Sequence, residues 1–324
     1  MVRHADKYHR KESVPMNNLE RPDSVAIFGS MARRDGDLMS DKDVLIVSDN
    51  DHVRRSSSAA LRVAGWSPVC FTWRRLDRAA AGKGLFMQHL KLEASMVRDR
   101  NGRLRESLNR FCVRSEYDRE VAGSQALLGV LAKMPNCVGG RYWALDVLSV
   151  GLRTLGVATL ANHGIYEFSL KKILNSLHDI GVLKSGDREC LGAIRRYKWR
   201  HRNSKLQRPI SLKHTLKLVD LVSRRFRLGL HVRIIEADER LDSVATDDEI
   251  SPNWYLRSRV LERSLLALRP RASAAPEISD SKRRLQQLVR EPSQYGWRIK
   301  SQWSSLRNQL RLIAGSSEVL FPTS

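Results

Sequence analysis

The feature that most constrains the fold is a short apolar run that ends at a glycine and a serine. Residues Ser24–Phe28 predict a buried strand, and Gly29-Ser30 predicts a sharp turn directly after it. A second apolar run, Asp43–Val47, follows a polar break and predicts another strand. The two strands indicate a sheet, and a chain of 324 residues is long enough to add a second domain.

Helices and a further strand surround these two strands. Met31–Arg34 predicts the start of a helix that Asp35–Asp37 breaks, and residues 52–64 predict a longer helix. Val69–Trp73 predicts a third strand. Because strands and helices alternate, we expect a small mixed-sheet domain over residues 21–115.

The second half of the chain has a different pattern. After about residue 116, apolar residues recur at helical spacing and alternating β-branched runs are few. We therefore expect an all-α helical bundle over residues 116–235 and a basic helical extension over 236–324. An irregular lead-in is expected over residues 1–20. The expected fold class is α+β.

Residues around the first two predicted strands have properties suited to a phosphorylated ligand. Gly29 lets a triphosphate approach the backbone, while the Ser30 hydroxyl and Arg33 can contact phosphate oxygens. Asp41 and Asp43 are two apart, so on a strand both side chains point to one face. Two neighbouring carboxylates form an oxygen site suited to Mg²⁺, or to Mn²⁺ in its place. The sequence therefore predicts a metal site next to a triphosphate site.

The same residues resemble the pattern of a known family. Phe28-Gly29-Ser30, then Ala32-Arg33, then Ser40-Asp41-Lys42-Asp43 before an apolar run resembles the minimal nucleotidyltransferase pattern of the DNA polymerase beta superfamily. The resemblance is clearest over residues 24–73. It implies transfer of a nucleoside monophosphate from an NTP to an acceptor hydroxyl, with Asp41 and Asp43 as catalytic metal ligands. It also implies that the NTP is bound by Gly29, Ser30, Arg33 and Ser40.

Two departures from the family pattern bear on activity. Arg34 stands where family members often have glycine. Many members also carry a third carboxylate on a later strand, but Val69–Trp73 holds no acid, and Asp77 follows beyond the expected strand end. Three alternatives stay open: the site works with two carboxylates, another acid folds into it, or catalysis is lost.

The segment Gly84–Glu93 resembles a helix that follows the catalytic sheet in some bacterial nucleotidyltransferase-like proteins. His89 and Glu93 are four apart and share one helical face. Glu93 is a candidate for the missing carboxylate, and His89 is a candidate nucleotide contact. The alternative is a local pair in which Glu93 only orients His89 beneath the sheet.

A large positive charge points to a polyanionic partner. Lys and Arg number 57 against 35 Asp and Glu, for a formal net charge of +22. Such a surplus attracts nucleic acid, with RNA favoured, and aromatic rings among the basic residues can stack on unpaired bases. The residues predicted to bind nucleic acid are Arg195, Arg196, Tyr197, Lys198, Trp199, Arg200, Arg202, Lys205, Arg208, Arg224, Arg225, Lys282, Arg283 and Arg284.

One pair within this basic segment has a second interpretation. Arg196 and His201 have the R-x4-H spacing that resembles the ribonuclease signature of HEPN helical domains. In such a site, arginine would hold the phosphate and histidine would shuttle a proton. The alternative is a solvated basic helix end, because a segment this rich in arginine produces the spacing by chance.

Composition also bears on location. No apolar stretch is expected to reach the roughly 20 residues that crossing a bilayer requires, so no membrane partner is expected. The N-terminus has no apolar signal core. These features predict a cytoplasmic protein, in which neither disulfides nor a cysteine zinc site is expected from the scattered Cys70, Cys112, Cys137 and Cys190.

The leading hypothesis is a metal-dependent nucleotidyltransferase with RNA as acceptor, tRNA being one candidate. The family resemblance also allows an oligonucleotide second-messenger synthase or a protein-nucleotidylating enzyme, in a bacterial defence or toxin–antitoxin setting. A third hypothesis is a catalytically degenerate fold that binds nucleic acid as a subunit of a complex, with a partner protein.

Overall fold

The computed structural model describes residues 21–36, 40–202, 210–235 and 254–267. The chain divides into two compact units. The N-terminal unit contains residues Met1–Glu116 together with Gly164–Ser169, and the helical unit contains Tyr117–His163 and Leu170–Ser324. The protein is mixed α and β, with its four-stranded sheet in the N-terminal unit.

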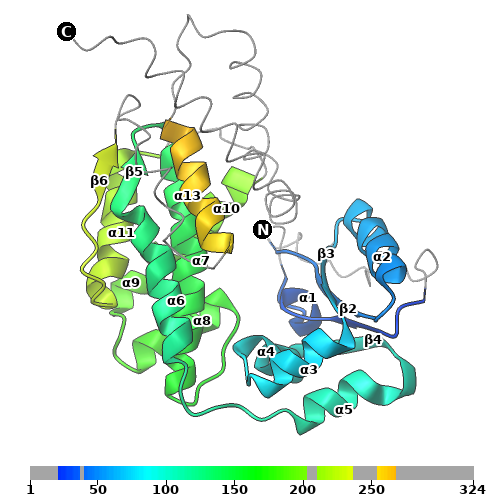
Figure 1. Cartoon of the computed structure of the whole chain (residues 1–324). Helices are drawn as coiled ribbons and strands as arrows, with labels where there is room; N and C mark the ends of the chain where they lie inside the picture. The colour runs from blue at the N-terminus through cyan, green and yellow to red at the C-terminus, as the bar shows by residue number, and fades with distance from the viewer. Residues whose placement is uncertain (1–20, 37–39, 203–209, 236–253, 268–324) are drawn as a thin grey trace, which may run out of the picture. The chain divides into compact units, whose positions relative to one another are not determined.

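The sheet of the N-terminal unit has the strand order β3-β2-β1-β4 (Figure 1). Its strands are β1 (Ser24–Ile27), β2 (Asp43–Val47), β3 (Ser67–Phe71) and β4 (Ser95–Asp99). Strand β1 is antiparallel to both β2 and β4, whereas β2 and β3 are parallel. The sheet is therefore mixed, as the sequence predicted.

Five helices accompany this sheet in the described part of the unit. They are α1 (Ser30–Arg33), α2 (Asp51–Val63), α3 (Trp73–Ala81), α4 (Leu85–Glu93) and α5 (Arg103–Arg110). The helix predicted over 52–64 is confirmed as α2.

The predicted third strand was placed two residues too late. Strand β3 ends at Phe71, and Trp73 begins α3 instead of ending a strand. The Thr72 hydroxyl accepts a hydrogen bond from Arg75 N at 3.1 Å, which caps the first turn of α3. This capping interaction ends the strand earlier than its apolar composition suggests.

Strand β4 was not predicted. Its sequence, Ser95–Asp99, alternates poorly, and it lies at the edge of the sheet beside β1. Asp99 ties it to the rest of the unit, because its carboxylate accepts from Ser24 Oγ at 2.8 Å and from Leu104 N at 3.0 Å. Pairing with β1 thus depends on contacts that no local pattern shows.

The two faces of the sheet are covered by different helices. Side chains alternate between faces along a strand, so Val44 and Leu45 point in opposite directions. One face packs Ala26, Leu45 and Val47 with apolar residues of α3, α4 and α5. The other packs Val25, Val44 and Ile46 against Leu61 of α2 and Trp66. The helices α3–α5 thus share one face of the sheet, and α2 covers the other.

The helical unit is organised around one long helix, α7 (Val138–Asn162). Helices that contact α7 are α6 (Asp118–Gly129), α8 (Leu170–Asp179), α10 (Ile194–Arg202), α11 (Leu212–Arg225) and α13 (Trp254–Ala267), while α9 (Ser185–Gly192) joins α8 and α10. Side chains on every side of α7 are buried, as expected for the central helix of a bundle.

The expectation that no stretch could cross a membrane was wrong as to length. Helix α7 is long and apolar enough to do so, but 78% of its most apolar window is buried inside the structure. Such burial is typical of the core helix of a soluble protein.

The helical unit was expected to be entirely α-helical, but it also contains two short strands. Strands β5 (Lys133–Pro135) and β6 (Arg233–Ile235) form a two-stranded parallel pair (Figure 1). Three residues are too few to show an alternating pattern in the sequence. Of the predicted basic extension over 236–324, the structure describes only α13; the rest lies outside the described residues.

A buried charged cluster joins α13 to α7. Arg259 lies 2.7 Å from Asp146 and 2.9 Å from Glu262, and each of the three residues is at most 3% exposed. Burying such charges is tolerated because they are paired. The pairing between helices far apart in the sequence holds α13 against the core helix.

Replacing Asp146 with Asn should destabilise the protein by about 3 kcal/mol, because Arg259 would keep its buried charge with one acidic partner removed. Urea denaturation followed by far-UV circular dichroism would measure the loss. The matched control is Asp220→Asn, which removes a carboxylate from an exposed pair with Arg224 at 2.9 Å. That change should shift stability by less than about 0.5 kcal/mol. Equal losses in both variants would contradict a stabilising role for the buried cluster.

Candidate functional site

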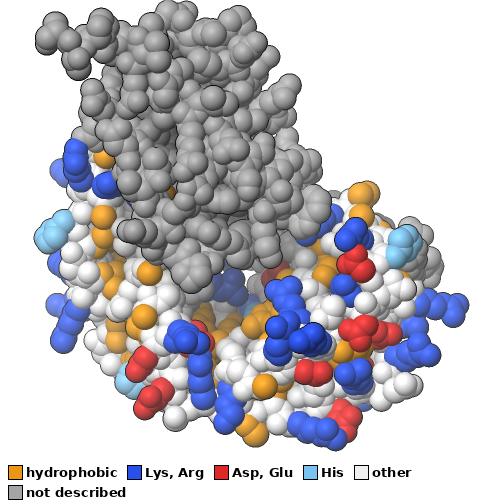
Figure 2. All heavy atoms as spheres, viewed as in Figure 1, with side chains coloured by type: hydrophobic (Ala, Val, Ile, Leu, Met, Phe, Trp, Pro, Cys, Tyr) orange, Lys and Arg blue, Asp and Glu red, His pale blue; other side chains and the backbone are white. Residues whose placement is uncertain are grey.

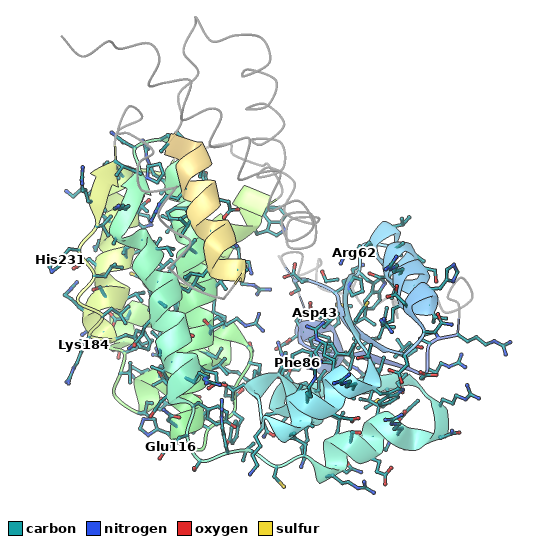
Figure 3. All side chains as sticks on the ribbon, in the orientation of Figure 1. Asp43, Arg62, Phe86, Glu116, Lys184 and His231 are labelled. Atoms are coloured by element: carbon teal, nitrogen blue, oxygen red, sulfur yellow. The ribbon has the colours of Figure 1, made fainter. Side chains whose placement is uncertain are left out.

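The candidate site is built where β1 ends and β2 begins. Phe28 N donates a hydrogen bond to Asp43 O at 3.2 Å, which ties the turn after β1 to the first residue of β2. Gly29 has φ +70° and ψ −147°, a conformation that side chains rarely permit. A Cβ at this position would lie 3.1 Å from Asp43 Oδ2. The carboxylate of Asp43 therefore lies directly against the glycine. Figure 3 labels the Asp43 side chain.

The turn leads into α1, which is a single helical turn. Ser30 Oγ donates to Asp41 O at 3.5 Å, a long hydrogen bond that brings the serine to the segment before β2. The helix ends at Arg34, which has φ 59° and ψ 26° in the left-handed region. Glycine adopts that region at lower energy than arginine, which gives a physical reason for glycine at this position in the family pattern.

The predicted metal ligands lie at the start of β2, but only one of them is on the strand. Strand β2 begins at Asp43, and Asp41 is exposed in the segment that precedes it. The prediction that both alternate along a strand is therefore wrong in detail. Asp43 shares its face of the sheet with Leu45 and Val47, the face covered by α3–α5. Ser40 lies one residue before Asp41, still close to the turn.

No acid on β3 completes the pair. Asp43 is paired across the sheet with Ser67, and Leu45 with Val69, so these side chains share one face. Asp77 lies on α3, 3.6 Å from Arg103. Within the part of the chain that the structure describes, no group of three His, Cys, Asp or Glu residues is placed to hold a metal ion. The metal site predicted at Asp41 and Asp43 therefore stays a prediction.

Arg33 and the α4 pair lie together. Arg33 Nη1 donates to Glu93 Oε2, and Arg33 Nε donates to Asp35 Oδ2 at 3.0 Å. His89 Nε2 is 2.7 Å from the same Glu93 oxygen. Burial raises the pKa of Glu93, but the hydrogen bond and charge of His89 and the charge of Arg33 outweigh it and lower that pKa. The structure thus shows the contact between His89 and Glu93 that the sequence suggested, and it adds Arg33 to that pair.

The predicted nucleic-acid residues in the helical unit are only partly available. Arg196 is exposed on α10, while Tyr197 is half-buried with its hydroxyl 3.2 Å from His214 Nε2. Arg225 is paired with Asp187 at 2.6 Å. Tyr197 and Arg225 therefore contact other residues of the bundle, and their role in binding nucleic acid stays a prediction.

The other residues predicted to bind nucleic acid differ in their exposure and in how much of each one the structure describes. Arg195, Lys198 and Trp199 are half-buried on α10, and Arg224 pairs with Asp220 at the surface. Of Arg200, His201 and Arg202 the structure describes the helical backbone alone, so the R-x4-H spacing stays a prediction. Outside the described residues lie Lys205, Arg208, Lys282, Arg283 and Arg284.

The N-terminal unit carries a basic surface that was not predicted from the sequence, and we call it the arginine surface. It consists of exposed residues on α3 and α5 (Figure 2): Arg74, Arg75, Arg78, Arg103 and Arg105. Arg75 lies over the Phe71 ring at 4.3 Å and Arg103 over the Trp73 ring at 4.1 Å, which holds both guanidinium groups in place. The helical spacing of Arg74 and Arg78 was the signal that could have revealed it.

Comparison of the chain with protein-family models, with curated proteins and with solved structures finds no match.

Gly29→Ala should destabilise the protein by about 2 kcal/mol, from backbone strain together with a tight contact of 3.1 Å that would displace the Asp43 carboxylate slightly. The matched control is Gly65→Ala, since Gly65 also has positive φ (+78°) but a Cβ there would meet nothing within 4 Å. Gly65→Ala should lower the free energy of unfolding by only about 1 kcal/mol, from backbone strain without a close contact. Thermal and urea unfolding would compare the two. Losses of equal size would contradict close contact between residue 29 and the Asp43 carboxylate.

Proposed function

We propose that the chain is a metal-dependent nucleotidyltransferase that moves a nucleoside monophosphate from an NTP to a hydroxyl of a nucleic acid, with RNA favoured. The observation that carries the proposal is the contact between Gly29 and Asp43. Gly29 is itself buried, and its turn brings the Asp43 carboxylate to 3.1 Å from where a Cβ would be, next to the partly exposed Ser30. Asp41, two residues earlier, adds a second acid.

Each residue of the site would have a distinct role in such a reaction. Gly29 leaves room for the triphosphate, and Ser30 and Arg33 supply donors to its oxygens. Asp41 and Asp43 would hold Mg²⁺ or Mn²⁺, which when bound stabilises negative charge on the phosphates. In the transfer, the acceptor hydroxyl loses its proton to solvent and its oxygen forms a bond to the α-phosphorus. The bond from that phosphorus to the bridging oxygen breaks, and pyrophosphate leaves with the bonding electrons.

The arginine surface supports a polyanionic acceptor. It lies on the helices that cover the same face of the sheet as Asp43. Exposed arginines neutralise phosphates whatever the sequence of the strand. An acceptor with many phosphates therefore fits this unit better than a small molecule or a neutral protein surface does.

A second candidate function is a nucleic-acid-binding subunit that does not catalyse transfer. The specific observation in its favour is that β3 presents Ser67 and Val69, and no acid, beside Asp43 and Leu45. The two candidates differ in whether the Asp pair matters to chemistry or only to folding.

Asp43→Asn should abolish transfer, and Asp41→Asn should lower it at least about a hundredfold, because each removes an ionised ligand from a site with two. The assay incubates purified protein with each labelled NTP, Mg²⁺ and cellular RNA, and follows label into the RNA. Asp77→Asn is the control, because Asp77 lies on α3 beside Arg103, and it should retain activity within about twofold.

The fate of the label distinguishes the alternatives. Label in free oligonucleotides or on protein would keep the reaction and change the acceptor. No transfer by the wild type, together with RNA binding that both Asp variants retain, would favour the non-catalytic subunit.

Reversing two charges of the arginine surface should weaken RNA binding. We expect Arg74→Glu/Arg78→Glu to lower affinity for single-stranded RNA at least about tenfold at 0.1 M salt and to flatten its salt dependence. Filter binding across a salt series measures both. Arg55→Glu is the control, since Arg55 is 81% exposed on α2, which covers the other face of the sheet. Equal losses of RNA affinity per reversed charge on α2 and on α3 would indicate general electrostatic attraction and no defined binding surface.

A further inference from the structure

Arg33 is held from two sides by acids of different elements. Its Nε donates to Asp35 at 3.0 Å and its Nη1 donates to Glu93 of α4, which leaves Nη2 with no partner among the residues that the structure describes. The side chain is only 16% exposed. A long flexible side chain is thus fixed in one position within three residues of Ser30, with donors left over.

Glu93 is itself held by a packed histidine. His89 and Glu93 are one helical turn apart on α4, with side chains 9% and 10% exposed and 2.7 Å between their bonded atoms. The His89 ring stacks on Phe168 with centroids 4.3 Å apart. It also meets Phe28 edge-on at 5.4 Å. Because Phe28 directly precedes Gly29, these contacts connect the packed core to both Arg33 and the turn.

This geometry opposes the hypothesis that Glu93 is the third metal ligand. The Arg33 guanidinium donates a hydrogen bond to Glu93 Oε2, and His89 contacts the same oxygen. A divalent cation on Glu93 would have to lie beside the positive charge of Arg33, which repels it. It also opposes a direct contact of His89 with nucleotide, because its ring is covered by Phe168 and Phe28.

We propose that Glu93 and His89 are positioning residues that hold Arg33 in place to bind the β- or γ-phosphate of an NTP. The inference rests on the proposed function, because it assigns these residues to the same triphosphate site. Glu93 acts through Arg33, and His89 acts through Glu93. Neither touches the reacting atoms.

The test is equilibrium binding, which does not require catalysis. Isothermal titration with each of the four α,β-methylene NTPs and Mg²⁺ compares the full-length wild type with Glu93→Gln, Arg33→Ala and the double variant. Glu93→Gln keeps the size of the side chain and removes the charge that holds Arg33. We expect each single variant to bind about tenfold more weakly, and the double variant to bind no more weakly than Arg33→Ala alone.

Glu106→Gln is the matched control, because it makes the same change in an exposed pair with Arg110 on α5. It should leave binding unchanged. If the wild type binds nucleotide and Glu93→Gln binds equally well, this inference is overturned while the proposed function stands. If the wild type binds none of the four analogues, the proposed function fails and this inference fails with it. Losses that multiply in the double variant would show that Glu93 acts independently of Arg33 and would also overturn it.

Should Glu93→Gln not fold, Arg33→Lys replaces it. Lysine keeps the charge but has a single ammonium, which cannot bond Asp35, Glu93 and a phosphate in the geometry of a guanidinium. Weaker binding by a folded Arg33→Lys supports the proposal, and wild-type affinity overturns it.

Discussion

The site depends above all on the antiparallel pairing of β1 with β2. Ile27 is paired with Val44, so the residues just past the end of β1 meet the residues just before β2. That register brings Gly29 against the Asp43 carboxylate, with the bond from Phe28 N to Asp43 O closing the pair. A slip by one residue would move Asp43 to the face that α2 covers and separate it from α4. Both faces of the sheet are apolar and packed, which makes such a slip unfavourable.

Local pattern was enough to predict the elements that carry the register. The runs that form β1, β2 and α2 are each apolar at the period of their structure and end at glycine or polar residues. Local pattern failed to predict the strands whose formation depends on tertiary contacts. Strand β4 forms because β1 offers an edge and Asp99 bonds both Ser24 and α5, and β5 forms because β6, about a hundred residues later, lies beside it.

The residues of the site also include some that local sequence predicts and others that only tertiary contacts bring together. Gly29, Ser30 and the Asp pair could be predicted because they are close in the sequence and their spacing has direct geometric meaning. The contact of Arg33 with Glu93 could not, since it joins residues separated by 60 positions, and it changes what each residue can do. Glu93 was a candidate metal ligand or a partner of His89, and it contacts both His89 and Arg33. Asp77 was expected beyond the strand end, and it lies on α3.

What the positive charge of this chain can bind depends less on the number of basic residues than on whether each one is already paired with a carboxylate. Arg225 and Arg259 each contact a carboxylate and are mostly buried, so their charge stabilises the fold and is not offered whole to a polyanion. Arg74 and Arg78 are exposed one turn apart on α3, where a phosphate backbone can reach both. The basic segment on α10 that the sequence emphasised packs Tyr197 against His214, whereas α3 covers the face of the sheet to which Asp43 belongs. A net charge of +22 therefore predicts a polyanionic partner without locating it. Among the described residues, the exposed arginines of α3 and α5 lie in the N-terminal unit, on helices that cover the face of the sheet where Asp43 lies. That placement is what supports our proposal of a polyanionic acceptor for this unit.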